Sequence, residues 1–160
     1  MSEPVERPEI SDGVPVPRQR LAAYAMVVAD GRILLTQLSH RTGWPGGWTL
    51  PGGGVDHGED PKDTVVRETY EETGQHLSEP VLVDVESDHF QGVSPRGVLE
   101  DFHAVRLLFQ ATVVEPAEPI VHDVGGTTSD ARWVSLDEAE ELDLVALARN
   151  ALNRARFLAQ

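Results

Sequence analysis

Residues 52–75 read GGGVDHGEDPKDTVVRETYEETGQ, and this stretch predicts a glycine-rich loop that leads into a short helix. Asp60 is suited to cap the first free amides of a helix, and Pro61 suits the first helical position. Gly74 can adopt the left-handed conformation that ends a helix. We therefore expect one helix over residues 61–73.

Three glutamates, Glu68, Glu71 and Glu72, lie on this expected helix. At about 100° per residue, Glu71 falls ~60° to one side of Glu68 and Glu72 ~40° to the other, so one face holds all three. At this spacing a pair repels by roughly 3 kcal/mol at an effective dielectric of ~20, but by less than ~1 kcal/mol in open water. A solvated acidic face is one interpretation. The other is a site for Mg²⁺ or Mn²⁺, which bind carboxylates, carbonyls and water.

The glycines before the helix favour the metal interpretation. Gly52, Gly53 and Gly54 let the backbone approach a phosphate or offer a carbonyl to a metal ion, and the start of the helix adds amides that bind anionic oxygens. Phosphate and metal sites would then be adjacent. We expect these three glycines to contact substrate.

The spacing of these residues resembles the box of the Nudix hydrolase (MutT-like) family. The matching pattern is Gly53, five residues, Glu59, seven residues, Arg67-Glu68, two residues, Glu71-Glu72, one residue and Gly74. A chance match at a given start has odds on the order of one in a hundred million. The departures fall at softer positions: Thr69 and Gln75 stand where aliphatic residues are usual, and Asp56 replaces a common glutamate.

The resemblance implies a metal site and a reaction. Glu68, Glu71 and Glu72, with the backbone carbonyl of Gly53, would hold Mg²⁺ or Mn²⁺, and water would displace a phosphate of a nucleotide-like diphosphate. Which carboxylate takes the proton varies within the family and stays open here. The candidates are Glu68 and Glu71 in the box and four acids in later loops: Glu100, Asp101, Asp123 and Asp130.

Arg67 is also a candidate catalytic residue on this resemblance. The favoured role for Arg67 is structural, as a salt bridge to Glu59 or Glu71 that orients the helix. Two aromatic residues flanked by loop segments, Trp44 and Phe90, are candidates to stack on a base; the alternative is that they pack within the protein. Substrate markers of the family are absent, so the subfamily and substrate are not assigned.

The length of 160 residues suits one domain. Residues 1–20 contain four prolines and no apolar periodicity, so we expect a flexible tail or an edge-hugging extension, followed by a Nudix domain over residues 21–160. Asp30-Gly31 predicts a hairpin turn. The expected fold is an α/β/α sandwich with a mixed central sheet. Its strands are expected over 21–29, 33–38, 48–50, 81–93, 102–114 and 132–135, with a second helical segment over 136–160.

Composition excludes several classes of function. The chain has no cysteine, which excludes disulfides, thiolate zinc sites and a cysteine nucleophile. The net charge of −14 repels phosphodiester backbones, so duplex nucleic acid is not an expected partner. No apolar run reaches the length of a membrane helix and no signal peptide is apparent, so we expect no membrane partner and a cytoplasmic location.

Alternatives to a hydrolase remain open at this point. A Nudix-like sensor would bind a nucleotide without cleaving it, although such a protein would be expected to have degraded box glutamates. Isopentenyl-diphosphate isomerases share the fold but need a cysteine that this chain lacks. A purely structural domain would leave its acidic helix without a metal. A homodimer is a further expectation from the family, with the tail before Leu21 offering an edge strand.

Overall fold

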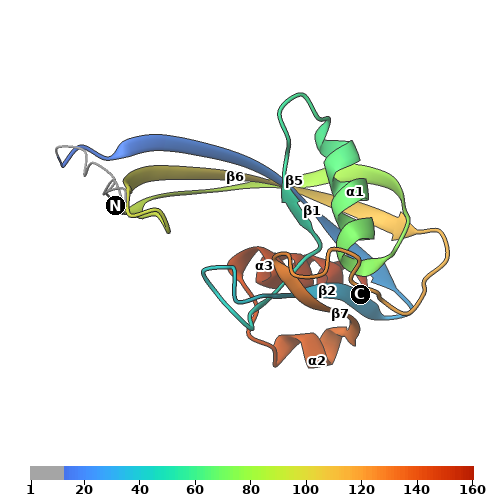
Figure 1. Cartoon of the computed structure of the whole chain (residues 1–160). Coiled ribbons are helices and arrows are strands. Elements are labelled where there is room, and N and C mark those ends of the chain that lie inside the picture. The colour runs from blue at the N-terminus through green and yellow to red at the C-terminus, as the bar shows by residue number, and fades with distance from the viewer. Residues whose placement is uncertain (1–12) are drawn as a thin grey trace, which may run out of the picture.

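A seven-stranded mixed sheet organises the chain in the computed structural model, which describes residues 13–160. The strands are β1 (Val16–Ala29), β2 (Arg32–Leu38), β3 (Trp48–Thr49), β4 (Gly52–Gly54), β5 (Leu77–Val93), β6 (Leu99–Val113) and β7 (Thr128–Ser135). The helices are α1 (Pro61–Thr73), α2 (Leu136–Glu140) and α3 (Ala146–Leu158). Helix α1 lies on one side of the sheet and α2 and α3 lie on the other (Figure 1). The expected α/β/α sandwich is confirmed.

Strand β1 lies at the centre of this sandwich and supplies both of its cores. Successive side chains of a strand point to opposite faces. Met26 therefore packs in the cluster beneath α3, with Tyr24 against it, whereas Ala23, Ala25 and Val27 pack in the cluster beneath α1. Because each face is covered, this strand positions the helices on either side of the sheet.

Strand β1 includes the last residues of the segment expected to be a flexible tail or an edge-hugging extension. The strand begins at Val16, five residues before the predicted start, and pairs in parallel with β6 from Val16 opposite Glu100 onward. Its early residues lack apolar periodicity, but β6 supplies hydrogen-bond partners for their backbone, which is the contact that a strand requires. Residues 1–12 of the predicted tail lie outside the described residues.

The predicted hairpin after β1 is confirmed. Asp30 and Gly31 both have positive φ, 51° and 69°, as the mirror-image turns of two-residue hairpins require. Val28 lies opposite Ile33 at the end of the two strands. The later strands, β5, β6 and β7, are present but begin earlier than predicted.

The strands β1, β6 and β5 extend together well beyond the helices as a three-stranded ribbon (Figure 1). We call its outer part, residues 16–20, 89–93 and 99–103, the arm. Phe90 is 53% exposed on it and packs against Phe102, with ring centroids 5.4 Å apart.

Helix α1 forms as predicted from its terminal signals. The Asp60 carboxylate accepts a hydrogen bond from the Lys62 amide at 2.8 Å, and Pro61 is the first helical residue. Gly74 ends the helix in the left-handed conformation, and its amide bonds the Tyr70 carbonyl. Thr69 and Gln75 stand where the family usually has aliphatic residues, but both side chains are almost wholly buried. This face of the helix therefore packs against the domain despite the two polar residues.

The C-terminal helical segment is divided into α2 and α3, which corrects the expectation of one segment. Between them the chain runs extended beside Trp48, whose amide bonds the Asp143 carbonyl and whose carbonyl accepts from the Val145 amide. These backbone bonds to β3 take the place of helical ones. None of the helices described within residues 13–160 is long and apolar enough to cross a membrane.

Candidate active site

The glycine loop and α1 meet at the edge of β1. Strand β4 pairs with β1, which places Gly52 opposite Tyr24. A β-carbon at Gly52 would lie 2.3 Å from the Ala23 carbonyl oxygen, and one at Gly53 would lie 2.8 Å from Oε1 of Glu68. Glycine is therefore required at both positions for the loop to fit between β1 and the helix.

Glu72 is the most deeply enclosed acid of this site, with 6% of its surface exposed. Its Oε1 accepts the Gly52 amide at 3.2 Å, and its Oε2 accepts the Thr128 hydroxyl at 2.6 Å. Burial raises the pKa of Glu72 to about 8, against these two hydrogen bonds, and repulsion from Glu68 adds to the rise. Burial also raises the pKa of Glu68. Two neighbouring carboxyl groups in this condition favour a proton or a cation beside them.

Arg67 holds the other carboxylates of the box. It binds both oxygens of Glu59 at 2.9 and 3.0 Å, which is the bidentate geometry. Its Nη1 donates to Glu68 at 3.2 Å and to Glu71 at 3.3 Å. Hydrogen bonding to Arg67 is the main reason that the pKa of Glu59 lies at about 2. The salt bridge expected to orient the helix is thus present with both of its anticipated partners.

The donors of this site suit a hard divalent cation. Glu68 and Glu72 are carboxylates pressed against the backbone of Gly53 and Gly52, and carboxylate and carbonyl oxygens are the ligands that Mg²⁺ and Mn²⁺ prefer. Within residues 13–160, no three acidic or histidine side chains are already gathered in a metal-binding arrangement. Glu71 is 41% exposed and pairs with Arg67 at 3.3 Å, whereas Glu72 is buried and the Glu68 side chain is 19% exposed.

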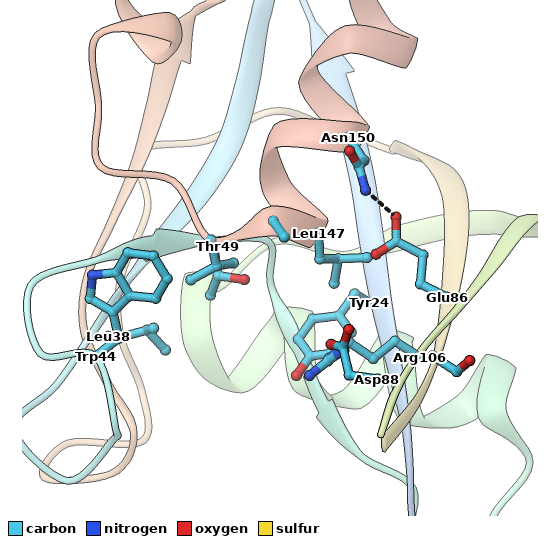
Figure 2. Close-up of a pocket in the computed structure, with 12 residues that line it drawn as sticks. Tyr24, Leu38, Trp44, Thr49, Glu86, Asp88, Arg106, Leu147 and Asn150 are labelled. Atoms are coloured by element: carbon cyan, nitrogen blue, oxygen red, sulfur yellow. Dashed lines mark hydrogen bonds and ion pairs between the residues drawn. The ribbon is translucent and has the colours of Figure 1, made fainter. Parts of the chain in front are cut away.

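A cavity of about 640 Å³ opens beside the box loop (Figure 2). Tyr24 belongs to its wall and also lies against Gly52, so the cavity and the box share this residue. Trp44, 47% exposed, stands at the other side, where its indole N–H donates to Asp143 at 2.8 Å. The remaining wall residues are Leu38, Thr49, Glu86, Ser87, Asp88, Arg106, Val145, Ala146, Leu147 and Asn150.

Comparison with protein-family models finds the NUDIX domain over residues 18–159, nearly the whole chain. This chain belongs to the Nudix hydrolase family. Its similarity extends to nucleoside triphosphatase NudI of Salmonella agona, at 29% identity over 141 residues, covering 84% of this chain and 95% of that protein. The same triphosphatase from Salmonella schwarzengrund matches to the same extent.

Solved structures of Nudix proteins share the fold. The MutT NUDIX hydrolase from Burkholderia pseudomallei superimposes with a TM-score of 0.63 at 30% identity, over 85% of this Nudix hydrolase and 97% of that chain. The NUDIX domain of Shewanella oneidensis NrtR, solved with ADP-ribose, gives a TM-score of 0.68 at 21% identity, with coverage of 89% and 90%. At this lower identity, the second match bears on the fold alone.

In the folded Nudix hydrolase, most of the predicted site residues lie close together, at the box or in the cavity beside it. Gly52 and Gly53 border the box glutamates, whereas Gly54 faces the side chain of Arg20. Trp44 lines the cavity, as Figure 2 shows. Phe90 is the exception. It lies on the arm two residues beyond Asp88, the last cavity residue of β5, because the long pairing with β6 carries it past the cavity.

Four further candidate proton acceptors were expected in loops, but only Asp123 lies in one, because Glu100 and Asp101 belong to β6 and Asp130 belongs to β7. Glu100 pairs with Arg18 at 3.2 Å and Asp101 with His89 at 2.8 Å, both on the arm. Asp130 pairs with Arg132 at 2.8 Å. Asp123 alone of the four lies beside the box, where its amide bonds the Glu71 carbonyl at 3.0 Å.

Two site residues of this Nudix hydrolase were not predicted. Thr128 binds Glu72 from the start of β7, and Tyr24 joins the box loop to the cavity from the middle of β1. Neither belongs to a motif in the sequence. For Tyr24 a weak signal existed, since it is a polar aromatic residue within the otherwise apolar run over residues 21–29.

Proposed function

We propose that this Nudix hydrolase is a metal-dependent pyrophosphohydrolase that cleaves a nucleoside diphosphate linked to another group, or a (d)NTP. One observation carries the proposal: the buried Glu72 and the partly buried Glu68 lie beside each other against the glycine loop, with raised pKa values. Such a pair favours a proton or a cation beside it, and a bound cation would also stabilise the charge of a diphosphate placed there. The similar NudI proteins, named as nucleoside triphosphatases, support a nucleotide substrate.

The residues take the following parts. Glu68, Glu72 and the carbonyl of Gly53 would hold Mg²⁺ or Mn²⁺, with Glu71 as a further ligand once it leaves Arg67. The bound ion supplies positive charge to the diphosphate oxygens and activates water for attack. Backbone amides of the glycine loop and the start of α1 contact phosphate oxygens. A carboxylate must take the proton from water.

Two further residues of the proposed site, Arg67 and Trp44, are not metal ligands. Arg67 keeps the loop acid Glu59 and the helix acids in register, so its contribution is chiefly one of position. Trp44 offers an exposed ring at the cavity for a base to stack on.

A substrate panel tests this proposal. Wild type and Glu72→Gln would be incubated with ADP-ribose, NADH, dinucleoside polyphosphates, nucleotide sugars and (d)NTPs, with Mg²⁺ or Mn²⁺, and phosphate or pyrophosphate release measured. We expect cleavage by wild type, loss of at least ~10²-fold in Glu72→Gln, and none without divalent metal. Glu115→Gln, an exposed acid just beyond β6, is the matched control and should retain full activity.

Turnover that is unchanged in a folded Glu72→Gln protein would refute the proposal. Binding of a nucleotide by wild type without cleavage, seen as a shift in melting temperature, would instead support the non-hydrolytic sensor. Calorimetric titration with Mg²⁺ or Mn²⁺ separates both from a purely structural domain, which should show no specific site.

The expected homodimer and cytoplasmic location stay predictions. In favour of the dimer, the edge of β1 over residues 16–20 that faces away from β6 has no paired strand within residues 13–160, and free edges invite pairing with another chain. Sedimentation equilibrium would measure the oligomeric state. A monomer at all accessible concentrations would contradict the dimer.

A further inference from the structure

The cavity beside the box has one carboxylate without a cationic partner. Its three charged residues are Glu86 and Asp88 on β5 and Arg106 on β6. Arg106 lies opposite Glu86 in the strand pairing but forms its ion pair with Asp88. Glu86 bonds instead to a neutral group, the side-chain amide of Asn150 on α3, at 2.6 Å. Figure 2 shows this pair on the wall across from Trp44.

The Glu86–Asn150 pair presents hydrogen-bond acceptors to a ligand. Asn150 donates one amide hydrogen to Oε1 of Glu86, which orients both side chains. The second carboxylate oxygen of Glu86 and the amide oxygen of Asn150 have no other hydrogen-bond partner within residues 13–160. A ligand that fits here must therefore bring donors, and two adjacent donors would match the two oxygens of a carboxylate.

Among the common nucleobases, guanine has this arrangement. Its ring N1–H and exocyclic amino group are adjacent donors on one edge, which a carboxylate can bind in parallel. Adenine and cytosine place an acceptor nitrogen next to their amino group, and uracil places a carbonyl oxygen on each side of its single N–H. These acceptors would face the oxygens of Glu86 without a hydrogen between them, an unpaired contact that is costly once the bound base shields it from water.

We propose that Glu86, supported by Asn150, is a specificity-determining residue that selects a guanine base in this cavity. The inference rests on the proposed function for its reaction. The base stacks toward Trp44, and its phosphates extend past Tyr24 to the glycine loop, because Tyr24 belongs both to the cavity wall and to the contact with Gly52. Because Arg106 and Asp88 form an ion pair with each other, Glu86 is the charged residue that discriminates guanine from the other bases.

The test compares GTP, ITP and ATP as substrates, since ITP keeps the N1–H of guanine but lacks its amino group. For wild type we expect kcat/KM to fall in the order GTP, ITP, ATP, with roughly 10- to 100-fold between the extremes. Glu86→Gln should remove at least ~10-fold of that preference while ATP cleavage changes less than ~3-fold. Asn150→Ala, on the exposed side of α3, should weaken the preference partially, and Glu115→Gln should leave it intact.

A second readout separates this inference from the proposed reaction. Binding of GDP, IDP and ADP would be measured by tryptophan fluorescence without divalent metal. Preferential GDP binding that Glu86→Gln abolishes supports the inference even if no nucleotide is cleaved, in which case the pyrophosphohydrolase proposal alone fails. Cleavage with no preference for guanine, or an equal loss for all three bases in folded Glu86→Gln, overturns the inference and leaves the proposed function standing.

Discussion

The hydroxyl of Thr128 donates a hydrogen bond of 2.6 Å to Oε2 of Glu72. Thr128 begins β7 and Glu72 lies in the last turn of α1, so this bond joins two elements that are 56 residues apart in the chain. With the Gly52 amide on the other oxygen, both ends of the carboxylate are held. We conclude that β7 takes part in orienting the innermost acid of the site.

Replacing Thr128 by valine should impair both turnover and stability. Valine has a similar shape but no hydroxyl, so Glu72 loses an orienting donor, at a cost of about 1–3 kcal/mol in unfolding free energy. We expect kcat/KM to fall ~10- to 100-fold and the lower limb of the pH profile to move to higher pH, because the Thr128 bond lowers the pKa of Glu72. Thr128→Ser should retain most activity. An unchanged profile in Thr128→Val would contradict this role.

The stability of the metal-free protein should fall as pH rises from about 5 to 8. The folded state keeps a proton on Glu72 up to its pKa of about 8, whereas the unfolded chain releases it near the ordinary value of 4.5. Between these values the folded state binds more protons, so the free energy of unfolding decreases with rising pH. Urea denaturation at pH 5, 6.5 and 8 measures the slope. Glu72→Gln should flatten it; the same slope in that variant would assign the effect elsewhere.

The two central glycines of the loop should respond differently to alanine. At Gly52, with φ of 150° and a β-carbon 2.3 Å from the Ala23 oxygen, we expect a loss of at least ~3 kcal/mol in stability. At Gly53 the clash is with the Glu68 carboxylate, so we expect kcat to fall ~10²-fold with a smaller change in melting temperature. Gly58→Ala, at positive φ with open space around it, is the control and should cost ~1 kcal/mol.

Thr69→Val should stabilise the protein without altering turnover. Within residues 13–160, the Thr69 hydroxyl is buried and has no hydrogen-bond partner, so its removal relieves a desolvation penalty worth about 1 kcal/mol. Differential scanning calorimetry should show a melting temperature higher by ~2–4 °C. Thr73→Val is the contrasting variant, since the Thr73 hydroxyl donates to the Thr69 carbonyl at 2.6 Å and its loss should destabilise. A decrease in Thr69→Val would show that the hydroxyl has a partner, such as bound water.

Elements specified by neighbouring residues were predictable from the sequence. Helix α1 begins after Asp60 and ends at Gly74 as expected, because capping depends on residues a few positions apart. The Asp30-Gly31 turn follows from the same kind of local rule. Box spacing placed Arg67 beside its acidic partners, since positions four apart on a helix are neighbours.

Contacts between distant segments were not predictable in this way. The pairing of Val16 with Glu100 extends β1 into a segment without apolar periodicity, and the length of the β5–β6 pairing carries Phe90 beyond the cavity. Backbone bonds between Trp48 and residues 143–145 interrupt the C-terminal helix. In each case the deciding partner is a backbone far away in the chain.

By itself, the sequence determined the family, the glycine loop, the acidic face of α1 and the turn at Asp30-Gly31, because these depend on local conformation and on residue spacing. Only the tertiary structure decided that Thr128 holds Glu72, that Tyr24 connects the box to the cavity, and that Glu86 faces that cavity bound to Asn150. Those contacts depend on the order and register of strands in the sheet. Strand order and register are set by the packing of the whole domain, which no local pattern of residues encodes.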